Sequence, residues 1–140
     1  MNSDICQIIY AARDCGDVHC HIIEDEYMTL SDLAPRFGLI FTPGTYKEIG
    51  REQAEEVARY ILHKDLAYGS ELMSNEAAEE LVSRFFDRFD ETTAQYYTNG
   101  NYYADRSNHS WSPATTATFD TGVLIVGKSC SGCLWVEDED

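Results

Sequence analysis

Two apolar runs near the end of the chain predict a pair of antiparallel strands. Residues 122–126 and 133–136 are almost entirely apolar, and they flank the small, polar segment 127–132. This pattern is typical of two strands and a tight connection. Because side chains alternate between the faces of a strand, the unbroken apolar run 123–126 predicts a central strand that is covered on both faces.

A helical period marks the middle of the chain. Thr45 and Glu48 have the spacing of a capping box and predict a helix over residues 45–63. Gly50 weakens the first turns of that helix, so a start near residue 50 is the alternative. The apolar positions of the segment form one stripe, which we expect to face the core. The stripe consists of Ala54, Val57, Ala58, Ile61 and Leu62.

A second helix is predicted over residues 75–91, with Ser74 as its N-cap. Its apolar stripe contains three phenylalanines, and glutamates and aspartates occupy much of the remaining surface. The large apolar side chains of this stripe favour a role in the core. The stripe consists of Ala78, Leu81, Val82, Phe85, Phe86 and Phe89.

The N-terminal region predicts shorter elements. A helix over residues 4–13, capped by Ser3, precedes a strand over residues 18–23. In that strand the even-numbered residues share one face, and the two histidines and Ile23 share the other. A single helical turn is predicted over residues 32–37.

The tyrosine-rich segment 96–103 predicts a β-hairpin. Its Asn-Gly pair at residues 99–100 suits a type I′ turn, which would place Tyr97 opposite Tyr102 and Tyr96 opposite Tyr103. The following segment, 105–116, is polar and contains proline, so it predicts a surface loop with an exposed Trp111.

Together these elements predict an α+β fold in a single domain over residues 1–140. Three to four antiparallel strands, mainly from the C-terminal half, are expected to pack against the two main helices. The length and the hydrophobic content of 44% suit a globular protein with a proper core.

The formal net charge of −15 limits the classes of partner. Nucleic acid and anionic membranes carry the same sign and are disfavoured as direct partners. No apolar segment approaches the roughly 20 residues of a membrane helix, and the first residues do not resemble a signal peptide. We therefore expect a cytoplasmic protein with reduced cysteines.

The five cysteines leave more than one interpretation. Cys130 and Cys133 form a C-x-x-C pair, and Cys15 and Cys20 could complete a tetrahedral zinc site. Against zinc, Cys133 and Cys20 occupy apolar strand positions, where a reduced cysteine acts as a small hydrophobe. We expect reduced cysteines and no cofactor, with zinc and a redox pair as the alternatives.

We predict no catalytic residues. A nucleophilic site would need Cys15 or Cys20 beside His19, His21 or His109, and nothing in the sequence fixes that geometry. The chain has no Walker loop, no G-x-G-x-x-G motif and no calcium-binding loop of the D-x-D-x-D-G type.

Acidic groups and aromatic side chains supply the candidate partner-binding residues. Acidic surfaces that carry aromatic residues suit the rapid capture of a basic protein. The predicted acidic contacts are Glu24, Asp25, Glu26, Glu137, Asp138, Glu139 and Asp140, and the predicted aromatic contacts are Tyr97, Tyr102 and Trp111.

From these residues we predict an acidic, inhibitory protein-binding module that neutralises a cationic partner. The basic surfaces of enzymes that act on nucleic acid fit this role. The protein would then be an immunity protein for a bacterial nuclease toxin or an anti-restriction mimic of DNA. A small zinc-stabilised domain, an adaptor or regulatory protein and, less favoured, an enzyme are the alternatives.

Overall fold

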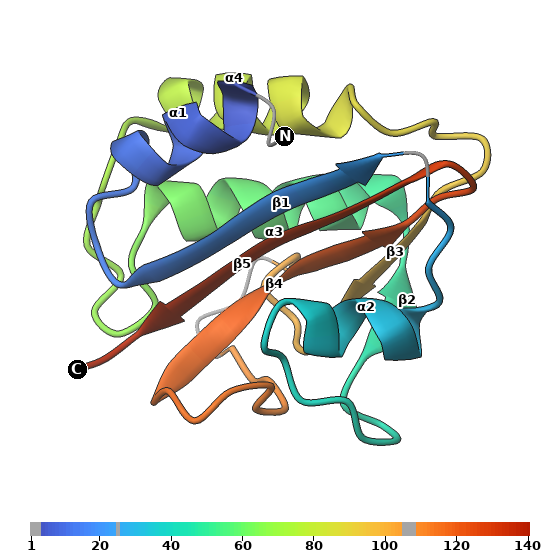
Figure 1. Ribbon diagram of the computed structural model, residues 1–140. Helices are drawn as coiled ribbons and strands as arrows, with labels where there is room; N and C mark the ends of the chain where they lie inside the picture. Colours follow the sequence, from blue (N-terminus) through green and yellow to red (C-terminus); the bar gives the residue numbers. More distant parts are fainter. Residues whose placement is uncertain (1–3, 25, 105–108) are drawn as a thin grey trace.

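The computed structural model describes residues 4–24, 26–104 and 109–140 (Figure 1). Within these residues the chain is α+β, with four helices around a five-stranded antiparallel sheet. The helices are α1 (Asp4–Ala12), α2 (Leu30–Arg36), α3 (Arg51–His63) and α4 (Asn75–Phe86). The strands are β1 (Asp17–Glu24), β2 (Lys47–Ile49), β3 (Gln95–Thr98), β4 (Phe119–Val126) and β5 (Cys130–Asp138).

The predicted C-terminal strand pair is confirmed, and it forms the middle of the sheet. The strand order is β1-β5-β4-β3-β2, and β4 pairs with β5 from Phe119 opposite Asp138 to Val126 opposite Ser131. Both strands extend beyond the apolar runs that predicted them. The sheet has five strands, not three to four, because β1 joins it on one side and the short β2 on the other.

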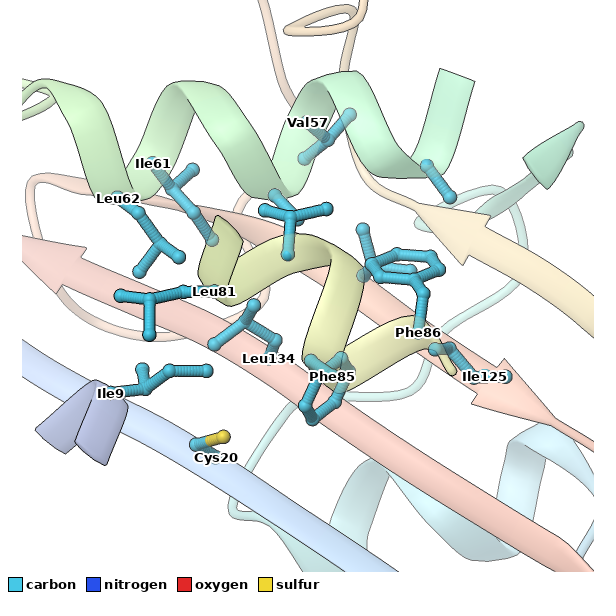
Figure 2. Close-up of a cluster of buried hydrophobic side chains, with 14 of the residues drawn as sticks. Ile9, Cys20, Val57, Ile61, Leu62, Leu81, Phe85, Phe86, Ile125 and Leu134 are labelled. Atoms are coloured by element: carbon cyan, nitrogen blue, oxygen red, sulfur yellow. The ribbon is translucent and has the colours of Figure 1, made fainter. Parts of the chain in front are cut away.

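Helices cover the two faces of the sheet unequally, as Figure 1 shows. On the first face α1, α3 and α4 build the larger core against β1, β5, β4 and β3. Figure 2 shows side chains of these helices meeting the strand residues Cys20, Leu134 and Ile125. The predicted stripes of both main helices are buried in this core, which confirms their role.

The second face carries a smaller core under α2. Leu33 and Ala34 of this seven-residue helix pack with Leu124, Cys133 and Trp135 of the sheet. Alternate residues of β4 therefore enter different cores, and both of its faces are covered, as the sequence predicted.

The helix predicted over residues 45–63 begins later, at Arg51. Gly50 is its N-cap, and the Gln53 side chain accepts a hydrogen bond from the Gly50 N–H at 2.9 Å. Residues 47–49 instead form β2, which pairs with β3. The alternative start near residue 50 is therefore the correct one, and the capping-box pattern at residue 45 is misleading.

The predicted hairpin over residues 96–103 is wrong. β3 lies between β2 and β4, so Tyr96 is opposite Ile49 on one side and Ile125 on the other. The chain then turns away, and Gly100 forms an isolated bridge with Trp111. A β-carbon on Gly100 would collide with the Ser110 carbonyl oxygen, so the glycine serves this close approach and not a type I′ turn.

A buried ion pair joins four segments at one end of the sheet. Arg13, which follows α1, donates to both carboxylate oxygens of Asp138, at 3.1 and 2.8 Å. The same guanidinium donates to the Ile61 carbonyl of α3 at 2.5 Å and to the Cys15 carbonyl at 2.6 Å. Asp138 also accepts the Leu66 N–H at 2.8 Å. The side chains of both charged partners are almost completely buried.

We expect Asp138→Asn to destabilise the protein by about 3–5 kcal/mol, because it leaves the Arg13 guanidinium buried without a counter-charge. Urea unfolding at neutral pH measures this loss. Asp140→Asn, at an exposed position two residues further on, is the control and should change stability by less than about 0.5 kcal/mol. A loss below about 1 kcal/mol for Asp138→Asn would contradict the central role of the pair.

Candidate functional site

The predicted acidic residues lie at opposite ends of the β1–β5 ribbon. The register places Glu24 opposite Cys130 at one end and Asp17 opposite Glu137 at the other. Glu24 and Glu26 are therefore far from the C-terminal residues, and Asp25 lies outside the described residues. The acidic groups do not form one continuous surface.

The C-terminal acidic run is not the open patch that the sequence predicted. Asp138 is buried in its ion pair with Arg13, and Glu137 is half-buried and lies 2.5 Å from His19 Nε2. Side chains alternate between the faces of β5, so the fold directs these neighbouring carboxylates to different environments. Only Glu139 and Asp140 are exposed, and Glu139 accepts the Thr118 N–H at 3.1 Å.

The other predicted acidic residues, Glu24 and Glu26, each lie near an arginine from another part of the chain. Arg88, which follows α4, contacts the Glu24 carboxylate, and Arg36 of α2 lies 3.8 Å from Glu26. The sequence shows no basic residue next to these glutamates. The tertiary fold brings both arginines close to them. Exposed pairs of this kind contribute little to stability, and both glutamates remain about half exposed.

Two of the three predicted aromatic contacts are held mainly inside the protein. Tyr102 is buried, with its ring stacked on His109 at a centroid distance of 4.4 Å. Trp111 is half-buried between Tyr102 and Phe119. The expectation that Trp111 is exposed is therefore wrong, because Trp111 forms a bridge with Gly100 and packs against the first core. Tyr97 is half-buried on the second face of the sheet.

A different set of large apolar and aromatic side chains reaches solvent on the second face of the sheet. Tyr27 is 63% exposed, Ile40 46% and Phe41 41%. The Phe41 ring stacks on Tyr46, which packs edge-on against the buried Trp135. With Tyr97, these residues form what we call the aromatic surface. Its members are Tyr27, Ile40, Phe41, Tyr46 and Tyr97.

The strand register explains why Tyr97 belongs to this surface. Tyr96 is directed into the first core together with Ile49, so the next residue points to the second face together with Glu48. The short α2 covers only part of that face. The tyrosine beside Glu48 is consequently left at the rim of the second core.

Hydrogen bonds hold the loop that presents Ile40 and Phe41. The Ile40 N–H donates to the Ala114 carbonyl at 2.7 Å, and the Tyr46 hydroxyl donates to the Ile40 carbonyl at 2.5 Å. Both backbone groups of Ile40 are therefore satisfied while its side chain stays exposed. The loop presents apolar side chains in a fixed arrangement, which lowers the entropic cost of binding a partner.

Buried Asp120 fixes the neighbouring segment at Ala114, whose carbonyl accepts the Ile40 N–H. Its carboxylate accepts hydrogen bonds from Ala114 N, Thr115 N, Asn99 Nδ2 and Trp135 Nε1. Burial raises the pKa of Asp120, and the hydrogen bonds from Ala114, Trp135 and Thr115 oppose that shift. The sequence did not single out Asp120, because no local pattern shows that donors from the preceding turn, from Asn99 and from Trp135 surround it.

Charge borders the aromatic surface. Burial raises the pKa of Tyr97, and the nearby Glu48 and Tyr27 raise it further. Burial likewise raises the pKa of Tyr46. Both phenols therefore stay protonated at neutral pH, and each can donate a hydrogen bond. Glu48 and Glu26 are exposed and add negative charge to this side of the molecule.

The structure does not bring the four candidate zinc ligands together. Cys15 lies beside Asp138, and Cys130 is opposite Glu24 at the other end of the ribbon. Cys20 enters the first core and Cys133 the second, on opposite faces of the sheet. Among the described residues, no group of three or more histidine, cysteine, aspartate or glutamate side chains is arranged to hold a metal ion.

The two candidate nucleophiles, Cys15 and Cys20, have a raised pKa, as does Cys133. Burial raises the pKa of Cys15, and both Cys20 and Cys133 have a raised pKa in the buried interior. Each of these sulfurs is therefore held as a thiol, whereas a reactive cysteine needs the thiolate.

Comparison of the chain with protein-family models, with curated proteins and with solved structures finds no match. In the part of the chain that the structure describes, none of the helices is long and apolar enough to cross a membrane.

A shallow groove beside α2 contains two histidines of β1. The groove has a volume of about 420 Å³ and is lined by His19, His21, Ile23, Arg36 and Phe37, among others. The His21 ring stacks on Phe37 at 5.1 Å, and its Nε2 lies 3.3 Å from the Tyr10 hydroxyl. Burial lowers the pKa of His21, and the neighbouring His19 lowers it further.

This lowered pKa predicts a loss of stability in mild acid. Above a pH of about 6.5, His21 is mainly neutral in both the folded and the unfolded protein, so it does not make the free energy of unfolding depend on pH. As the pH falls below that value, the unfolded chain binds the proton more readily than the folded one, so the free energy of unfolding decreases. Urea unfolding between about pH 7.5 and 5 measures this slope.

His21→Phe should reduce the slope while keeping the ring stack on Phe37. His63→Gln, on α3, is the control and should retain the slope of the wild type because His21 is still present. An unchanged slope in His21→Phe would show that other groups cause the pH dependence.

Proposed function

We propose that this protein is an acidic inhibitory module that binds a cationic protein through its aromatic surface. The observation that carries the proposal is the exposure of Tyr27, Ile40 and Phe41 together with half-buried tyrosines on a hydrogen-bonded framework. Aromatic side chains on a fixed framework are typical energetic centres of protein interfaces.

The overall charge supports a cationic partner. The net charge is −15, and several arginines already face carboxylates of the same chain. Arg51 lies within 4 Å of Glu55 and Glu91, and Arg59 contacts Glu56. These internal pairs leave the acidic excess to set the field around the molecule. Such a field accelerates encounter with a positively charged protein.

Charge and aromatic contact supply different parts of the binding. The negative charge attracts a cationic partner over a long range, which raises the association rate, and it repels nucleic acid. Buried aromatic contacts lower the dissociation rate. Enzymes that act on nucleic acid have basic surfaces that fit this combination. The partner we propose is a nuclease toxin, with the protein as its immunity protein.

The anti-restriction mimic of DNA is the less favoured form of the same proposal. A mimic of DNA needs carboxylates in rows that replace phosphates. Here the acidic groups are divided between separate parts of the surface, and the exposed centre is aromatic.

We expect Tyr27→Ala and Phe41→Ala each to weaken binding of the partner by about 30-fold or more, the effect of removing an interface side chain worth about 2 kcal/mol. The partner is first isolated from the source cell's lysate on tagged protein at low salt. Affinity of the purified pair is then measured by calorimetry.

Tyr68→Ala is the matched control for these variants. Tyr68 is 72% exposed, but it lies in the α3–α4 connection, whose turn is fixed by Asp65 through the N–H groups of Tyr68 and Ser70. Its removal should leave affinity unchanged. Equal losses for all three variants, or no loss for any, would contradict the aromatic surface as the binding site.

The inhibitory function needs two further results. The retained protein should be basic and bind more weakly at roughly tenfold higher salt, which screens surface charge. Its nuclease activity should fall to zero as one equivalent of the acidic protein is added. A retained protein that is acidic, indifferent to salt or fully active in the complex would overturn the proposal.

A further inference from the structure

Two cysteines from different elements meet in the first core. Cys6 of α1 and Cys20 of β1 are completely buried, and their sulfur atoms are 3.0 Å apart. Figure 2 shows the Cys20 side chain pointing from β1 into this core beside Ile9 of α1. A disulfide bond needs an S–S separation of about 2.0 Å, so a shift of about 1 Å would join the two sulfurs.

A second contact fixes α1 on the same strand. The Tyr10 hydroxyl donates to the Cys20 carbonyl at 3.1 Å and accepts the Cys20 N–H at 2.9 Å. The outer backbone groups of Cys20 therefore bind α1 while its side chain meets Cys6. These contacts hold the two sulfurs close together, which lowers the conformational cost of joining them.

We propose that Cys6 and Cys20 are a site of disulfide formation that fastens α1 to the edge strand of the sheet. The proposal is independent of the partner and of the aromatic surface. It also replaces the expectation that all five cysteines are reduced, which rested on the cellular compartment and on their odd number.

The fold separates the other three cysteines from Cys6 and Cys20, which makes these two the favoured disulfide partners. Cys133 lies on the opposite face of the sheet, Cys15 is beside Asp138, and Cys130 is at the far end of β5. The fold brings the sulfur atoms of Cys6 and Cys20 to within 3.0 Å of each other. This close approach favours one connectivity.

The reaction balances with a small disulfide, such as oxidised glutathione, as the oxidant. One cysteine thiol loses its proton and attacks the oxidant, which releases one glutathione thiol and leaves a mixed disulfide. The second cysteine thiol loses its proton and displaces the other glutathione. Two protein thiols are oxidised, and one glutathione disulfide is reduced to two thiols.

Burial controls when this exchange can occur. Hydrogen bonding to Cys6 and burial raise the pKa of Cys20, so the folded protein holds it as an unreactive thiol. α1 has nine residues and lies at the margin of the fold, against β1 and α4. Local opening of this short helix would expose both sulfurs, and its return would bring them together.

Peptide mapping tests the bond directly, because trypsin places Cys6 and Cys20 in separate peptides. Cleavage after Arg13, Arg36 and Lys128 puts Cys6 in residues 1–13, Cys15 and Cys20 in residues 14–36, and Cys130 and Cys133 in residues 129–140. The full chain is equilibrated in glutathione buffers of graded ratio. Remaining thiols are then alkylated in denaturant at low pH, before mass spectrometry without reduction.

We expect the oxidised protein to carry three alkyl groups, five less the two cysteines in the bond, and to yield peptide 1–13 linked to peptide 14–36. The Cys15→Ser variant should give the same link, which assigns it to Cys20. Cys20→Ala should abolish it. Peptide 1–13 recovered alkylated and unlinked at every ratio, or a link that requires Cys15, would overturn the proposal.

A second measurement tests whether the disulfide bond stabilises the attachment of α1 to the sheet. The bond closes a loop of about 15 residues, so oxidation should raise the melting temperature by on the order of 10 °C. It should also slow amide exchange in α1. No change in either property on oxidation of the Cys15→Ser variant would show that the bond does not fasten the helix.

Discussion

The buried pair between Arg13 and Asp138 determines how the ends of the structure meet. Its hydrogen bonds connect the chain after α1, the end of α3, the α3–α4 connection and the last residues of β5. Taking two charges from water is expensive, and here the carboxylate and the carbonyl groups of Ile61 and Cys15 satisfy the guanidinium. Gly16 completes the arrangement, because a β-carbon there would collide with the Asp138 carboxylate. The acidic C-terminus is thus used partly to close the fold.

The unequal covering of the sheet produces the candidate site. Three helices bury the first face, whereas the seven-residue α2 covers only part of the second. Apolar residues at the margin of the second core must then remain partly exposed, and hydrogen bonds to Ile40 and the buried Asp120 keep their loops in place. The same face thus combines order with exposed apolar area, the combination that favours binding at low entropic cost.

The fold accommodates the acidic charge because most carboxylates of the described residues lie outside the two cores. The buried ones among these residues are each satisfied in a specific way: Asp138 by an arginine, Asp120 by neutral donors and Asp65 by the backbone N–H groups of its own turn. Repulsion among the remaining acidic groups costs stability, which the large first core offsets. Our proposal assigns that excess charge to the attraction of a cationic partner.

The sequence by itself determined the two main helices, the central strand pair and the α+β class, because hydrophobic periodicity depends only on residues that are close together in the chain. It also indicated that aromatic side chains matter, but it named Tyr102 and Trp111, which the fold holds against its core. Tertiary structure alone decided that β3 pairs with β2 and β4, that Asp138 is buried, and that Cys6 meets Cys20. The physical reason is that a local pattern specifies which face of an element is apolar. Which distant face will cover it depends on every other surface that must be buried at the same time.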